Sequence, residues 1–191
     1  LTGNTTYDYL STEIAYWLFS LQDTDGGLFA GYDRFNNLMN YKVTEGNIDA
    51  FNALQGYTPF HADLLNFLEQ DRWDAADRNL TAWPGNARHL FALDVFPWSY
   101  LIFEDYPVSA LTSADRFLCT HTAVNGAQMM GYCFDEDKDV VWPEGTGQMT
   151  LAFHFAGMMT EKDFYLNEME KVLFQNSDHA DAAGFPYATN K

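Results

Sequence analysis

Residues 141–149 read Val-Trp-Pro-Glu-Gly-Thr-Gly-Gln-Met. Proline is tolerated in the first turn of an α-helix, and the residues after Pro143 have helical apolar spacing, so a helix is predicted to begin here. Glu144 then faces the positive end of the helix dipole, which favours a carboxylate. Gly145 and Gly147 cost helix stability, so we expect a packing or ligand reason for the pair.

Two more acids stand in matching places upstream. Glu45, Asp94 and Glu144 recur at intervals of 49 and 50 residues, and each opens an apolar segment of helical character. A period of about 50 residues is typical of arrays of like units. We therefore expect one carboxylate in each unit, at equivalent places around one opening of the array. The alternative for each acid is a purely structural role, because a carboxylate at a helix start also caps free N–H groups.

The apolar spacing predicts helices at about 5–21, 45–56, 60–70, 95–104, 109–120, 145–158 and 161–174. Thr44 is the expected N-cap of the second helix. Residues 22–27 and 83–86 carry turn signals, and 28–43 and 125–142 are predicted as hairpins or ordered loops. This order favours stacked α-hairpins over a parallel α/β sheet, whose strands would be apolar runs between the helices. We predict a single, mainly α domain over residues 1–191.

The composition narrows the range of partners. The chain has 191 residues, of which 47% are hydrophobic, and a formal net charge of −17. We expect a globular core and no nucleic-acid partner, because phosphate binding relies on clusters of Lys and Arg. Anionic membranes and polyuronates are disfavoured for the same reason, whereas a neutral sugar polymer is compatible. No membrane span or signal peptide is visible. The chain is compatible with a mature product, a fragment or part of a larger protein, so its localisation stays open, extracellular and periplasmic places included.

The spacing of the cysteines and of the potential metal ligands is weak evidence for a disulfide or a metal site. Cys119 and Cys133 could form one disulfide or none, and two free thiols are favoured because the count gives no framework. Asp135, Asp137 and Asp139 alternate like a Ca²⁺ loop but lack its Gly and its closing Glu, so a solvated acidic turn is favoured. The five histidines have no zinc-ligand spacing. We predict neither a metal nor another cofactor.

Acids framed by aromatic rings indicate a carbohydrate site. Sugar rings present C–H faces to aromatic side chains and hydroxyls to carboxylates, and glycoside hydrolysis uses two carboxyl groups. We predict Glu144 and Glu45 as the principal catalytic carboxylates, with Asp94 third. The expected substrate-binding residues are Asp49, Tyr32, Trp98 and Trp142.

Four stretches together resemble bacterial proteins of the six-hairpin glycosidase-like, (α/α) toroid class: residues 23–27 (Asp-Thr-Asp-Gly-Gly), residues 44–49 (Thr-Glu-Gly-Asn-Ile-Asp), Leu93-Asp94 with Trp98, and residues 141–149. The resemblance covers most of the chain. It implies part or all of an (α/α) toroid, with inner helices whose loop-side ends surround a carbohydrate site. A full toroid needs six hairpins, and at about 50 residues per unit this chain holds little more than half. Self-association is expected if the chain is a half toroid.

The expected function is that of a glycoside hydrolase acting on a neutral or weakly charged glycan. A polysaccharide lyase on the same scaffold is one alternative. It would need a Tyr or His base and a positive group to neutralise the uronate, and Arg and Lys are scarce here. The other alternative is a non-catalytic structural or assembly subunit that retains the scaffold.

Overall fold

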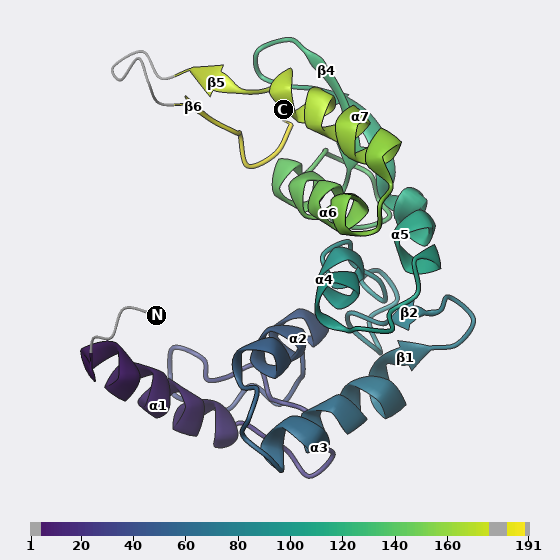
Figure 1. Ribbon diagram of the computed structural model, residues 1–191. Helices are drawn as coiled ribbons and strands as arrows, with labels where there is room; N and C mark the ends of the chain where they lie inside the picture. Colours follow the sequence, from purple (N-terminus) through teal and green to yellow (C-terminus); the bar gives the residue numbers. More distant parts are fainter. Residues whose placement is uncertain (1–4, 176–182, 190–191) are drawn as a thin grey trace. The chain divides into compact units, whose positions relative to one another are not determined.

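The computed structural model describes residues 5–175 and 183–189 (Figure 1). The chain divides into two compact units, unit 1 over Leu1–Trp73 and unit 2 over Asp74–Lys191. The described residues are mainly helical with a few short strands, as predicted. The single domain and the toroid stay predictions. No helix in the described ranges is long and apolar enough to cross a membrane.

From residue 5 onward, where its description begins, unit 1 contains three α-helices and a π-helical turn. These are α1 (Thr5–Phe19), α2 (Thr44–Ala53), α3 (Phe60–Phe67) and η1 (Leu68–Arg72). The core between α2 and α3 buries Ile48, Leu64 and Phe67. Thr44 is the first residue of α2 and Val43 occupies the cap position, so the predicted N-cap was wrong by one residue. The reason is that the extended Val43 carbonyl accepts the bonds of the first turn, from the backbone N–H and the side-chain amide of Asn47.

The Asp-Thr-Asp-Gly-Gly stretch forms a tight turn against α3. Gly26 has φ +92°, and a methyl group built on it would lie 2.1 Å from the Asp63 carbonyl oxygen. Lys42 pairs with both aspartates of the turn, at 2.7 Å from Asp23 and 2.5 Å from Asp25. The loop that follows is fastened to α2, because the buried Asn47 amide bonds the backbone N–H and C=O of Leu28.

Unit 2 is built around α6. This helix (Pro143–Phe155) packs against α4 (Val95–Ile102) and against α7 (Met159–Glu170). The other elements are α5 (Ser109–Ser113), η2 (Ala114–Phe117), β2 (Asn79–Leu80), β3 (Leu118–Thr122), β4 (Gln128–Tyr132), β5 (Phe174–Gln175) and β6 (Ala183–Gly184), while β1 (Trp73–Asp74) falls at the boundary of the units. The core includes the rings of Tyr132, Phe153 and Tyr165, which pack on one another between β4, α6 and α7.

Two predicted segments in unit 2 are corrected. The helix predicted over 109–120 ends at Phe117, and the chain continues directly into β3. The hairpin predicted over 125–142 instead spans 118–132, with antiparallel pairing of Leu118 to Tyr132 and Thr122 to Gln128. Thr120 and Thr122 have high β-propensity. Gly126, with φ +83°, supplies the turn between the strands.

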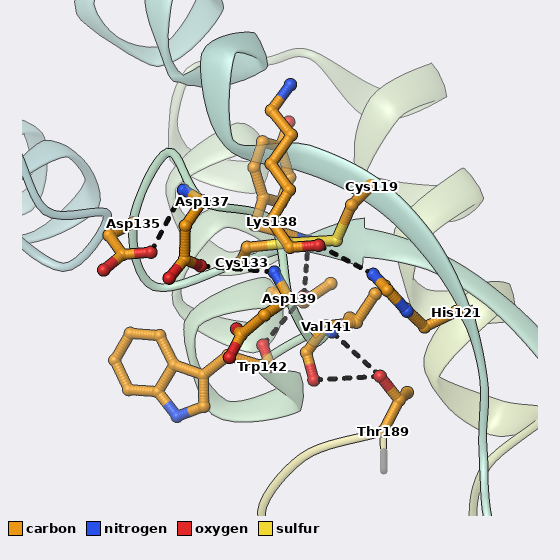
Figure 2. The surroundings of a disulfide bond; sticks show 12 residues. Cys119, His121, Cys133, Asp135, Asp137, Lys138, Asp139, Val141, Trp142 and Thr189 are labelled. Carbon is orange, nitrogen blue, oxygen red and sulfur yellow. Dashed lines mark hydrogen bonds between the residues drawn. A yellow bond between two sulfur atoms is a disulfide. The ribbon is translucent and has the colours of Figure 1, made fainter. Parts of the chain in front are cut away.

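The prediction of two free thiols is wrong, because Cys119 and Cys133 form a disulfide (Figure 2). The hairpin register sets Cys119 opposite Gly131 and places Cys133 one residue beyond β4. Their Cα atoms are 6.5 Å apart, within the range a disulfide spans. The bridge therefore ties β3 to the beginning of the loop that leads into α6.

Candidate functional site

The candidate site in unit 2 begins with two carboxylates at helix starts. Asp94 occupies the N-cap position of α4, is only 4% exposed, and accepts a 2.8 Å hydrogen bond from the Val95 N–H. Glu144 lies in the first turn of α6 and is exposed. Both helices therefore begin with an acid at the positive end of the dipole, as predicted from the sequence.

The structure brings these two helix starts together. The Leu93 N–H donates a 2.9 Å hydrogen bond to the Phe134 carbonyl, in the loop before α6. The Leu93 side chain packs on Gly145, since a methyl group built there would lie 2.6 Å from Leu93 Cδ2. Asp94 and Glu144 are thus the chain neighbours of two residues that contact each other within unit 2.

Close packing explains why position 145 is a glycine, but it does not explain the glycine at 147. A methyl group on Gly145 would lie 2.2 Å from Trp142 Cε3, because the indole folds back over the first turn of α6. At Gly147 the nearest atom is the Met169 methyl at 3.4 Å, an ordinary contact. Thr146, between them, is fully buried. Its hydroxyl accepts from the Tyr132 N–H and donates to the Trp142 carbonyl, which fastens α6 to β4.

Gly145 and Gly46 make a matched pair, since each directly follows its acid in the first turn of a helix. At Gly46 no atom of the described residues around the helix lies within 4 Å of an added methyl group. We expect Gly46→Ala to stabilise unit 1 by up to about 1 kcal/mol through helix propensity. Gly145→Ala should destabilise unit 2 by about 1–2 kcal/mol, because the clash of the added methyl group with Trp142 and Leu93 outweighs the gain in helix propensity. Urea unfolding of both variants measures the difference. A gain in both would show that Trp142 moves aside freely.

A charged cluster lies beside the helix starts, formed by Arg88, His89, Asp135 and Asp137. His89 Nδ1 is 3.2 Å and Arg88 Nε 3.6 Å from Asp135 Oδ2, and Arg88 also pairs with Asp137. Burial, and then the neighbouring Asp137, raise the pKa of Asp135. Hydrogen bonding with Asp135 lowers the pKa of Asp137. The cluster joins the loop before α4 to the loop before α6.

Aromatic rings line the same two loops. The His89 ring packs edge-on to Trp83 at 5.7 Å between centroids, and Phe134 packs edge-on to Trp142 at 5.5 Å. Among the described residues, the buried indole nitrogen of Trp142 has no hydrogen-bond partner. Trp98, on α4, is half-buried. The loop from Cys133 to Trp142 begins at the disulfide and contains Asp135 and Asp137 (Figure 2).

The remaining predicted site residues belong to unit 1. Glu45 is half-buried in the first turn of α2, and Asp49 is exposed one turn further on. Desolvation by the protein around it raises the pKa of Asp49. Tyr32 is exposed in the loop before α2, where it bridges to Leu38. The joint site of all three predicted acids stays a prediction.

Unit 1 also has an open acidic hollow of about 280 Å³, separate from these side chains. It is lined by Asp23, Thr24, Asp25, Gly26, Asp63 and Asn66. Lys42 neutralises two of its carboxylates. In the described ranges, no group of three or more acidic, His or Cys side chains is placed to hold a metal.

Sequence reasoning missed the charged cluster. Arg88 and His89 are separated from Asp135 and Asp137 by more than 40 residues, and neither pair has a spacing typical of a known motif. In the folded chain the two loops meet at the Leu93–Phe134 backbone bond and through the cluster itself. The sequence signal available was the position of His89 shortly before Asp94.

Comparisons with known proteins bear on the fold. No protein-family model and no curated protein matches the chain. Among solved structures, the chain is similar to endoglucanase Cel10, a family 8 glycosyl hydrolase from Klebsiella pneumoniae, with a TM-score of 0.52 and 14% identity. The match covers 85% of this chain and 59% of that enzyme, so this chain spans less than two thirds of its length. The likeness shows an α-rich fold similar to that of a family 8 toroid.

Proposed function

We propose that this protein acts on carbohydrate, as a glycoside hydrolase of neutral or weakly charged glycans. The observation that carries the proposal is the contact between Leu93 and Gly145, the chain neighbours of Asp94 and Glu144, at the starts of two packed helices. The likeness in fold to an endoglucanase supports it. Glycoside hydrolysis requires two carboxyl groups on either side of the scissile bond.

The two carboxylates differ in their surroundings. Glu144 is exposed at the positive end of α6, a setting that suits a base or a nucleophile. Asp94 is buried and held by the Val95 N–H, so its position is fixed before any ligand arrives. We propose Trp98 and Trp142 as the sugar platforms of unit 2. Unit 1 carries the further candidates Glu45, Asp49 and Tyr32.

The charged cluster weakens the case for a lyase. Elimination from a uronate needs a free positive group beside the base. Arg88 adjoins His89, but it is already paired with Asp135 and Asp137. A neutral glycan makes no such demand.

A screen for new reducing ends over a panel of neutral polysaccharides and polyuronates tests the proposal. We expect release from at least one neutral glycan. Unsaturated products from a polyuronate would instead identify a lyase. If protein with a native circular dichroism spectrum shows no turnover and no glycan binding by calorimetry, the proposal is contradicted and the non-catalytic subunit is favoured.

A further inference from the structure

Helix α1 exposes an unusually apolar surface. Of its residues Thr5–Phe19, only Ala15 is buried. It contacts the rest of unit 1 through its last turn, where Phe19 packs on Tyr57 and Phe60. Figure 1 shows α1 as one continuous helix at the start of the chain. Four large side chains form what we call the α1 stripe: Tyr7, Leu10, Ile14 and Trp17, exposed by 59%, 47%, 56% and 50%.

The spacing of the α1 stripe is that of a helix-packing seam. Its residues follow one another at steps of three, four and three, so they share one face. This is the alternation of two seam positions in a two-helix coiled coil. Contiguous exposed apolar side chains on a folded protein mark an interaction surface. A helix is therefore the partner that the stripe fits.

We propose that the α1 stripe binds the α1 stripe of a second copy of this chain, with the two helices antiparallel about a two-fold axis. The stripe reads aromatic, aliphatic, aliphatic, aromatic, which is symmetric about its centre near Thr12. Antiparallel pairing sets Tyr7 against Trp17 of the second copy, and Leu10 against Ile14. Aromatic side chains thus meet aromatic ones, and aliphatic side chains meet aliphatic ones. The same surface patch is used by both copies, as two-fold symmetry requires. The opposed helix dipoles also favour this direction over a parallel pair.

Charge sets the strength of this pairing. Glu13 flanks the stripe and would lie near its own copy across the axis, and each chain has a formal net charge of −17. Like charges weaken such a pair modestly, and salt screens them. A helix of this length is roughly 22 Å long, which places the interface at the small end of specific contacts. We therefore expect a reversible dimer that strengthens with salt and in Glu13→Gln.

Sedimentation over a concentration series tests the pairing through a charge swap. Leu10→Lys alone and Ile14→Glu alone each put a charge against an apolar partner, so each should leave only the monomer. The double variant sets each introduced ammonium against an introduced carboxylate, so it should restore the doubled mass. Tyr9→Lys is the matched control, since Tyr9 is 63% exposed on α1 but lies off the stripe. It should dimerise like the unmodified chain.

Three results would overturn the proposal. A monomeric mass of the unmodified chain at all concentrations would assign the stripe to another occupant, such as a helix of a different protein or of a longer chain. A dimer unaffected by Leu10→Lys would place the contact elsewhere. Failure of the double variant to dimerise, with helical content unchanged, would exclude antiparallel pairing, because a parallel pair sets like charges together. None of these results depends on glycan hydrolysis.

Discussion

Glu144→Gln is expected to lower glycan hydrolysis by about 10²–10⁴-fold, the contribution typical of a positioned acid or base. The amide keeps the shape of the side chain but can neither accept the proton nor attack the sugar. Because Glu144 is exposed, the free energy of unfolding should change by less than about 0.5 kcal/mol. The measurement is the turnover of the glycan identified by the screen, with urea unfolding of the same preparation.

Glu170→Gln is the matched control for this loss. Glu170 is an exposed acid at the end of α7 in the same unit, and its replacement removes the same charge. It should retain full turnover. If Glu144→Gln also retains full turnover, the assignment of Glu144 fails. Asp94→Asn should then be compared, since it alters the second carboxylate of the pair.

Gly26→Ala is expected to destabilise unit 1 by about 3 kcal/mol. One part of the loss, roughly 1 kcal/mol, is the cost of the left-handed backbone at φ +92° for a residue with a Cβ. The larger part, about 2 kcal/mol, is the clash of that Cβ with the Asp63 carbonyl, which must separate the turn from α3. Urea unfolding should show a lower midpoint with an unchanged slope.

Gly56→Ala separates the two parts. Gly56 has nearly the same φ, +94°, but in the part of the chain that the structure describes no atom lies within 4 Å of an added methyl group. We expect this variant to lose only about 1 kcal/mol, the backbone cost alone. Equal losses at Gly26 and Gly56 would mean that the turn moves away from α3 at little cost.

The helix starts were the most predictable part of this chain. Proline in the first turn marked α6, and Asp94 marked α4, because the physics of a helix start acts within a few residues. The limits of the β3–β4 hairpin were wrong. Gly-rich and acidic residues drew the prediction toward 125–142, although the turn at Gly126 lies inside the hairpin and the acids lie beyond it.

The candidate site was predictable only in its acids. The disulfide depends on hairpin register, and the charged cluster depends on the meeting of two loops that lie far apart in the sequence. Neither pairing can be read from residue spacing along the sequence. The reason for Gly145 was also hidden, because it depends on the rotation of the Trp142 ring over the next helix turn.

The disulfide matters for how the protein is prepared. Disulfides persist where thiols are oxidised and are rare in a reducing cytosol. Expression in a reducing cytosol, or a reductant in the purification buffer, would yield a hairpin without the Cys119–Cys133 disulfide. The following residue, Phe134, holds the loop before α6 to Leu93. A null result from reduced protein would therefore describe an altered site, and the oxidised preparation is the one to assay.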